Sequence, residues 1–471
     1  MNKKIIYLLS LLMALSLVFA SCKKNGITDA IGNPPSKETE VTNTTGGLIT
    51  KWDELKKYNA NAINDYAVIN ETGGDYYRNP VIVALGGANV LIVTEKRINF
   101  SGSANDIGVN GEKPVDIIYL FSKDGGDNFD KATIVGGKTS TGANDAVSAP
   151  VVYYKKDAGG NSSGKVYVIA SAGAGISRTG TDYASRNPKS TLKYSVGTVT
   201  DINDQINWTE WKDLDVSALG NLQFGTHSGR GIFKDDTMIL PIITAEQGRN
   251  GAAKEMMGVR FYEVTESGGQ LTLGQKIGQD VSFSAGTPNF SVYKEAKAVA
   301  YDKANSKVTY LAVPNPEGGN GKIGKGDSSA DNNVNATAIP GSEGSFGFHK
   351  FDNKGWYGSK EYDPSKYKTT PGQAGGANGS EAGTDQILFS HVTTPAGENH
   401  MYLLDDQQYQ PQNKSFKIAI TGKSSSIDVL DDGTIIVAAE KERNYKADGL
   451  KFNIFFSRYT QSYLASQLES K

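Results

Sequence analysis

Few residues of this sequence could do metal, thiol or nucleotide chemistry. The chain has 4 histidines and 1 cysteine, and no His-x-x-x-His or Cys-x-x-Cys spacing occurs, so little is left for a zinc site. Gly-x-Gly runs such as residues 229–231 lack a strand-to-helix context and predict no nucleotide site. The chain has 49 lysines and arginines and 51 acidic residues, and a planar guanidinium suits a carboxylate ligand.

A strand that runs into a polar turn is the clearest local motif. Residues 116–132 read DIIYLFSKDGGDNFDKA, in which an apolar strand is followed by Ser122, Asp124, two glycines and Phe129. Ser and Asp side chains satisfy the turn's own backbone donors, and glycine takes a positive φ. The aromatic ring is expected to pack back on the sheet. Strands that end in similar turns are found at residues 192–208, 259–270 and 347–358.

The elements that must position these residues are short β-strands. The chain has 54 glycines, 23 tyrosines and 17 phenylalanines, which suggests strands joined by tight turns. Apolar runs such as NVLIVTEKR and KVYVIAS follow one another from about Tyr76, without a long amphipathic helix between them. A sandwich, a barrel or a propeller would fit, and the repeats favour an all-β propeller. Six blades of roughly 70 residues exceed a compact blade, so long loops are expected at residues 314–344 and 364–383.

The N-terminus predicts export and a lipid anchor. A basic MNKK and the apolar run IIYLLSLLMALSLVFA are typical of a signal peptide, here residues 1–21, and the run is too short to span a membrane as a helix. Residues 20–22 resemble the lipobox of bacterial lipoproteins, so Cys22 is expected to carry lipid. The alternative is an ordinary signal peptide with an incidental cysteine. Residues 22–47 predict a flexible tether, and the propeller domain is expected over residues 48–471, with a short helix near residues 52–58.

Composition also narrows the partners. The formal net charge of −2 provides no global basic field, so no nucleic-acid partner is expected. Contact with a membrane is expected through the lipid anchor only, at the outer membrane or cell surface. We expect a monomer.

Short motifs of this chain resemble those of the bacterial sialidases. Residues 122–129, SKDGGDNF, resemble the Asp box S-x-D-x-G-x-T-W, with Asn for Thr and Phe for Trp. Residues 77–80, YRNP, resemble the Phe/Tyr-Arg-Ile-Pro signature of that family's first strand, and residues 94–97, TEKR, are similar to its Glu-x-Arg strand end. The similarity is strong in the first blade and weak in the last third. It implies a six-bladed β-propeller that removes terminal sialic acid with retention, without a metal or organic cofactor.

The resemblance also implies roles for single residues. Arg78 matches the first of three arginines that grip the sugar carboxylate, and Glu440 matches the glutamate that holds this arginine. Arg97 would line the same pocket. Asp106 matches the acid/base aspartate, and Glu295 resembles the glutamate that takes the proton of a tyrosine nucleophile. Such enzymes depart from the usual pair of catalytic carboxylates.

Other positions of the family pattern are not matched. Val313-Pro314 stands where the second arginine is expected, and residues 398–400, Glu-Asn-His, stand where the third is expected. Residues 422–426, GKSSS, occupy the place of the nucleophile. Tyrosines near these segments are Tyr310, Tyr402, Tyr409 and Tyr445, and cations that could compensate are Lys297, Lys423, Arg230 and His400.

Three functions are therefore compatible with the sequence. The first is a surface lipoprotein exo-α-sialidase that acts on sialylated glycans or glycoproteins. The second is a non-catalytic propeller that binds sialoglycans, and the third is another Asp-box propeller acting on plant or mucin glycans. The order and approximate spacing of Arg78, Arg97 and Asp106 favour the enzyme, because a lectin has less reason to retain an acid.

Overall fold

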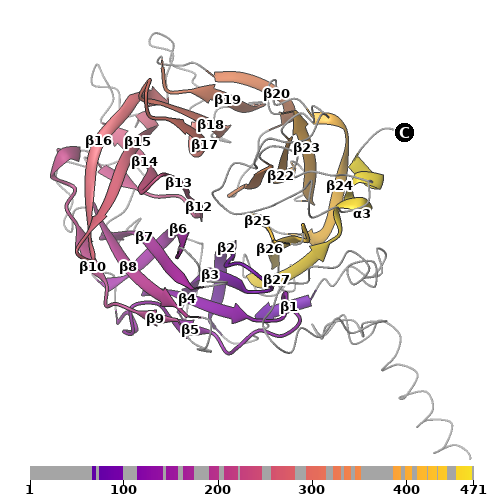
Figure 1. Ribbon diagram of the computed structural model, residues 1–471, viewed down its shortest axis with the longest axis horizontal. Coiled ribbons are helices and arrows are strands. Elements are labelled where there is room, and N and C mark those ends of the chain that lie inside the picture. Colours follow the sequence, from indigo (N-terminus) through magenta and orange to yellow (C-terminus); the bar gives the residue numbers. More distant parts are fainter. Residues whose placement is uncertain are drawn as a thin grey trace, which may run out of the picture.

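The computed structural model has six β-sheets arranged in a ring around a central axis (Figure 1). Each sheet is one blade, and the molecule is a six-bladed β-propeller. The all-β expectation and the number of blades are therefore confirmed. The structure describes residues 66–69, 74–98, 114–141, 145–157, 163–173, 190–200, 206–220, 223–246, 256–281, 293–314, 322–329, 334–340, 345–351, 386–393, 398–405, 411–421, 423–431, 433–442 and 452–468.

Blades 1 to 3 follow the first half of the chain. Blade 1 contains β2 (Tyr76–Ala84), β3 (Val90–Arg97), β4 (Val115–Ser122) and β5 (Thr133–Ile134). Blade 2 contains β6 (Val147–Lys156), β7 (Gly164–Gly173), β8 (Ser190–Val199), β9 (Asn207–Trp208) and β10 (Lys212–Leu214), and the short helix η4 (Ser217–Leu219) follows. Blade 3 contains β11 (Gln223–Gly225), β13 (Ile232–Lys234), β14 (Thr237–Glu246), β15 (Met256–Ser267) and β16 (Gln270–Val281). Between β11 and β13, β12 (Gly229–Arg230) pairs in parallel with β6 of blade 2.

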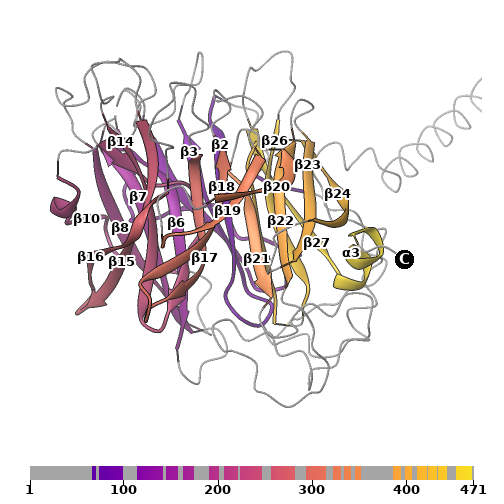
Figure 2. The ribbon, with the colours of Figure 1, turned by 90° about the horizontal axis from the view of Figure 1, so that it is seen from above.

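Blades 4 to 6 follow the second half, and the two ends of the fold meet in blade 6. Blade 4 contains β17 (Tyr293–Asp302), β18 (Lys307–Pro314), β19 (Lys322–Asp327) and β20 (Val334–Pro340). Blade 5 contains β21 (Gly347–Phe351), β22 (Gln386–Thr393), β23 (Glu398–Asp405) and β24 (Pro411–Thr421). Blade 6 contains β25 (Ser425–Val429), β26 (Ile435–Glu442) and β27 (Phe452–Tyr459), to which the early strand β1 (Tyr66–Ile69) adds by pairing with β27. The final helix α3 (Gln461–Leu468) lies beside β24 at the outside of the ring (Figure 2).

The hydrophobic core lies between neighbouring blades. Six clusters of buried apolar side chains each join one pair of adjacent blades. In β3, Leu91 and Val93 pack toward blade 2, whereas Val90 and Ile92 pack toward blade 6. Successive side chains of a strand point to opposite faces, and both faces are buried here. Strands of this kind are therefore nearly continuous apolar runs, which explains why they could be recognised in the sequence.

The polar turn after β4 has the hydrogen bonds that its residue types predict. Ser122 Oγ donates to Asp124 Oδ1 at 2.8 Å, and the backbone N–H of Gly126 donates to Ser122 Oγ at 2.9 Å. Phe129 packs against Phe456 of blade 6, with ring centroids 5.3 Å apart. The ring therefore fastens the turn to the neighbouring blade as well as to its own sheet.

Substitution of Gly126 by alanine is expected to destabilise the protein more than substitution of Gly137. Both glycines have positive φ, at 91° and 71°. A Cβ on Gly126 would lie 2.1 Å from Cζ of Phe456, whereas a Cβ on Gly137 would meet nothing within 4 Å. Overpacking of this kind costs typically about 1–3 kcal/mol. Denaturant unfolding of both variants measures the difference in the free energy of unfolding, and equal losses would contradict the expectation.

Several expectations can be compared with this fold. Residues 314–344 were expected to form a long loop, and this was wrong, because β19 and β20 lie within that range and complete blade 4. The high glycine and asparagine content of this segment suggested a loop. It is compatible with strands because β19 and β20 are the outer strands of blade 4, which need fewer apolar residues than inner strands. The signal peptide, Cys22, the tether, the helix near residues 52–58 and the loop at residues 364–383 lie outside the described residues. Within the described ranges, no helix is long and apolar enough to cross a membrane.

Candidate functional site

Arg78 is fixed at the inner edge of blade 1 by contacts with blade 6. Its Nε donates a hydrogen bond to Oε1 of Glu440 on β26, at 2.8 Å. Its guanidinium carbon lies 4.8 Å from the centroid of the Phe452 ring, within the range of a cation–π contact. The Glu440 side chain is fully buried, and that of Arg78 is 11% exposed. The contact that the resemblance implied between these two residues is present.

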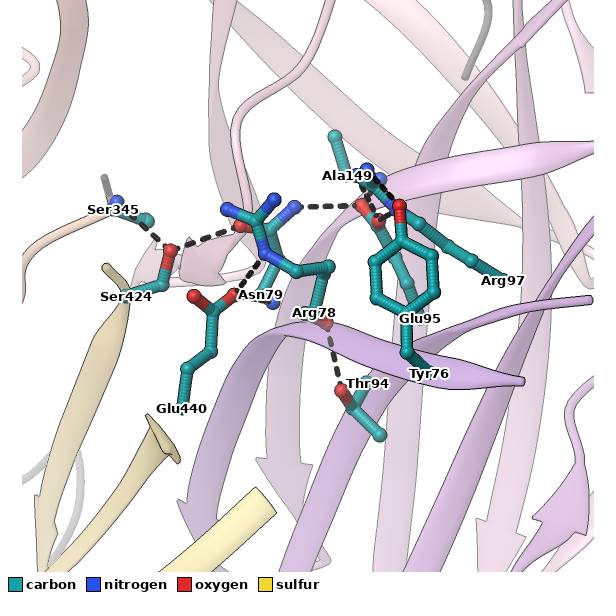
Figure 3. A network of polar contacts seen from close by, with 10 residues as sticks. All are labelled: Tyr76, Arg78, Asn79, Thr94, Glu95, Arg97, Ala149, Ser345, Ser424 and Glu440. Atoms are coloured by element: carbon teal, nitrogen blue, oxygen red, sulfur yellow. Dashed lines mark hydrogen bonds and ion pairs between the residues drawn. The ribbon is translucent and has the colours of Figure 1, made fainter. Parts of the chain in front are cut away.

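Short polar contacts continue from Arg78 into blades 5 and 6 (Figure 3). The backbone N–H of Asn79 donates to the same Glu440 oxygen at 2.6 Å, and Asn79 Oδ1 accepts from Ser424 Oγ at 3.0 Å. Ser424 Oγ in turn accepts from the backbone N–H of Ser345 at 3.1 Å. Ser424 lies in the segment where the resemblance places the nucleophile. Its buried hydroxyl instead joins the inner edges of blades 1, 5 and 6.

Glu295 lies on β17 and is fully buried. Its Oε1 accepts from Ser345 Oγ at 2.8 Å and lies 3.0 Å from Nζ of Lys297. Burial raises the pKa of Glu295, but the charges of Lys297 and His227 and the hydrogen bond from Ser345 outweigh it, and the net pKa is lowered. Lys297 Nζ also donates to Ser345 Oγ and to the carbonyl of Phe346. Among the residues that the structure describes, the hydrogen-bond partners of Glu295 are thus a serine and a lysine.

The residues expected to do the chemistry are only partly within the described ranges. Asp106, Tyr409 and Tyr445 lie outside them. Tyr310 is fully buried in the core between blades 3 and 4. Tyr402 lies on β23 of blade 5, where burial raises the pKa of its hydroxyl. The acid/base role of Asp106 and the identity of a nucleophile stay predictions.

Arg97 is buried at the far end of β3. Its side chain is 2% exposed, and its Nε and Nη2 donate to Oε2 of Glu95 at 2.9 and 2.7 Å. Its guanidinium carbon lies 5.7 Å from the centroid of the Tyr76 ring. The structure therefore places Arg97 in an ion pair inside the blades, and a contact between Arg97 and a substrate stays a prediction.

The places of the two unmatched arginines hold buried residues. Val313 belongs to the core between blades 4 and 5. Asn399 is fully buried on β23, and neither polar atom of its side chain has a hydrogen-bond partner among the described residues. Lys297, one of the cations that could compensate, is committed to Glu295 and its neighbours. The described part of the chain contains no group of three or more His, Cys, Asp or Glu side chains that could hold a metal ion.

A second charged cluster lies farther along the axis. Arg230 of β12 forms an ion pair with Asp428, with Nη1 2.9 Å from Oδ1, and His349 Nδ1 lies 3.0 Å from the same oxygen. Asp428 Oδ2 accepts from the backbone N–H of Ala84 at 2.8 Å. Because β25 runs beside β2, Asp428 lies roughly 13 Å from Ser424 along the strand, at about 3.3 Å per residue. In the sequence analysis, Arg230 was one of the cations that could compensate for the two unmatched arginines. In the structure it is paired with Asp428.

The Asp428→Asn variant is expected to be less stable at neutral pH and less sensitive to acid. Burial raises the pKa of Asp428, but Arg230 and His349 outweigh it and lower the pKa. A carboxyl with a lowered folded pKa stabilises the protein above its unfolded pKa of about 3.9, and this contribution is lost as the pH falls through the folded pKa. Denaturant unfolding at a series of pH values from neutral into the acid range measures this. The free energy of unfolding should fall more steeply with decreasing pH for the wild type than for Asp428→Asn, and equal slopes would contradict the prediction.

Comparison with solved structures identifies proteins of similar fold. No protein-family model matches the sequence, and no curated protein matches it. Among solved structures, the Trypanosoma rangeli sialidase is similar, with a TM-score of 0.55 at 12% identity over 86% of this chain and 60% of that one. The chain has a sialidase-like fold. A protein of unknown function from Dyadobacter fermentans DSM 18053 is also similar, with a TM-score of 0.51 at 11% identity over 84% of this chain and 97% of that one.

Likeness at these identities shows the sialidase-like fold alone. This chain spans about 60% of the length of the Trypanosoma rangeli sialidase. Within the fold, sequence motifs located Arg78 and Glu440, which the structure brings together. The sequence motifs did not identify Ser345 and Asp428 as part of the site, because the contacts of these residues join strands that are far apart in the chain.

Proposed function

We propose that the chain is an exo-α-sialidase that removes terminal sialic acid from host glycoconjugates with retention. The observation that carries this proposal is Arg78, which Glu440 and Phe452 fix at the inner edge of blade 1. A guanidinium fixed in this way is suited to a carboxylate, the group that distinguishes sialic acid from neutral sugars. The similar Trypanosoma rangeli sialidase in complex with 2,3-difluorosialic acid, as a covalent intermediate, supports the same class of ligand.

In this proposal Asp106 donates a proton to the leaving glycan oxygen, and a tyrosine attacks the anomeric carbon. Glu295 would take the proton of that tyrosine, and Glu440 keeps Arg78 in place. The turn at residues 122–129 acts as an Asp box that fastens blade 1. The mature chain would be a lipoprotein anchored through Cys22 at the cell surface, and the reaction uses no metal or organic cofactor.

A second candidate is binding of sialoglycans without hydrolysis, which the surroundings of Glu295 favour. Its Oε1 already accepts from Ser345 and lies beside the Lys297 ammonium. The lowered pKa of Glu295 makes its carboxylate a weak proton acceptor, because proton transfer is most efficient when the pKa is near the working pH. Arg78 would serve a binding protein as well as an enzyme.

Hydrolysis of a fluorogenic sialoside by the full chain tests the proposal. We expect turnover by the wild type, and the Asp106→Asn variant should lose about 10²–10⁴-fold in kcat, the usual contribution of a general acid. Binding of 3′-sialyllactose should persist in that variant. Binding without turnover in the wild type would favour the second candidate. Neither binding nor turnover would overturn both.

A further inference from the structure

The inner strands of two neighbouring blades each bend near their start, at a residue whose backbone conformation is rare for any residue other than glycine. Asn79 on β2 has a φ of 55°, and Ala149 on β6 has a φ of 53°. Each precedes a proline, and strand pairing shifts register at each. A residue before proline prefers extended backbone, and a non-glycine residue with positive φ persists only where its surroundings impose it. Some contact must therefore hold both bends.

One carboxylate oxygen contacts both bends, through the side chain of Asn79 and the backbone of Ala149. Glu95 Oε1 accepts from Asn79 Nδ2 at 2.9 Å and from the backbone N–H of Ala149 at 2.7 Å. Glu95 Oε2 accepts the two hydrogen bonds from Arg97. The side chains of Glu95 and Arg97 are 1% and 2% exposed. Both Glu95 oxygens are thus taken up inside the protein, so this carboxylate acts on a ligand only through its neighbours.

The bend at Asn79 leads directly to Arg78. The Asn79 backbone N–H and Arg78 Nε donate to the same oxygen of Glu440, at 2.6 and 2.8 Å. A change in the backbone at Asn79 would therefore move the guanidinium relative to Glu440 (Figure 3). Thr94, next to Glu95, adds a hydrogen bond from its Oγ1 to the carbonyl of Arg78 at 2.7 Å.

We propose that Glu95, which is ion-paired with Arg97, is a positioning residue for Arg78. It fixes the paired bends of blades 1 and 2 and so sets the direction in which Arg78 meets a carboxylate-bearing ligand. In this arrangement Arg97 acts on the ligand through Glu95. The catalytic consequence rests on the proposed function, whereas the geometric consequence does not.

A glutamine at position 95 cannot reproduce this arrangement. Its amide has one acceptor and one donor end, whereas the carboxylate accepts on both sides. The amide must turn its donor either toward Arg97 or toward Asn79 and Ala149, and each of these donates. A merely structural role for Glu95 predicts lower stability but an unchanged ligand affinity in the protein that remains folded.

The test compares Glu95→Gln with Glu266→Gln in the full chain. Glu266 is a matched control because its carboxylate also accepts from two side chains, Lys165 and Tyr167, at 2.8 Å each. It joins blade 3 to the first residues of β7 in blade 2. We expect Glu95→Gln to raise the KM for a fluorogenic sialoside, or the Kd for 3′-sialyllactose, by about 10- to 100-fold, as misplacement of a positioning group does. Its kcat should change less, and Glu266→Gln should change neither constant.

A crystal structure of the Glu95→Gln variant separates this proposal from the proposed function. We expect Asn79 to leave its positive φ and the contact between Arg78 Nε and Glu440 Oε1 to lengthen. An unchanged bend and contact would overturn the positioning role, even if the wild type hydrolyses sialosides. If the wild type neither binds nor hydrolyses them, the proposed function fails and the crystal structure still decides the geometry. Should Glu95→Gln not fold, Arg97→Lys, which keeps the charge but loses the fork, is examined in the same way.

Discussion

The Arg78→Ala variant is expected to lose both ligand recognition and stability. A hydrogen bond to a charged group contributes about 1.5–3 kcal/mol, which corresponds to roughly 10- to 100-fold in affinity or kcat/KM. The same substitution removes the cation beside the buried Glu440 carboxylate. Removal of one partner of a buried ion pair costs roughly 3–5 kcal/mol in the free energy of unfolding. Sialoside binding and denaturant unfolding measure the two losses separately.

The double variant Arg78→Ala, Glu440→Gln distinguishes these effects. A neutral amide in place of Glu440 no longer leaves a buried charge unpaired, so much of the stability should return. Recognition should not return, because the guanidinium is still absent. A double variant that recovers affinity for 3′-sialyllactose together with stability would show that Arg78 serves the fold and does not bind the ligand.

The Lys297→Met variant is expected to lose much of the free energy of unfolding, although Lys297 is not expected to contact the ligand. Methionine retains much of the aliphatic stem of lysine but removes the ammonium that lies 3.0 Å from Glu295. Glu295 is fully buried, so an uncompensated carboxylate would remain in the interior. We expect a loss of roughly 3–5 kcal/mol at neutral pH in the free energy of unfolding, measured by denaturant unfolding.

The stability of this variant is expected to change with pH in the opposite direction to the contribution of Asp428 in the wild type. Without Lys297, burial is expected to raise the folded pKa of Glu295 above its unfolded value. The folded state then binds more protons than the unfolded state between these two pKa values, so stability increases as the pH falls. The double variant Glu295→Gln, Lys297→Met should regain stability and lose this dependence. A Lys297→Met protein that loses stability on acidification as the wild type does would contradict this account.

The sequence by itself determined the strands, one turn and two residues of the site. Runs such as residues 90–97 were recognisable because both faces of each strand are buried between blades. The turn at residues 122–129 was recognisable because its hydrogen bonds are local, within four residues of Ser122 or Asp124. Arg78 and Glu440 were located by motif, and their pairing across 362 residues was expected only because the resemblance implied it.

Only the tertiary structure decided what surrounds those residues. Ring closure brings β2 beside β25 and β26, so Ser424 meets Asn79 and Asp428 meets Ala84. The structure also showed that Arg230 is paired with Asp428 and that Ser345 donates to Glu295, in each case between different blades. Short-range patterns report backbone preference and burial, whereas the partner of a buried charge depends on which distant strands meet at the axis. The chemistry of an ionisable group follows from that partner, and it is therefore a property of the closed ring.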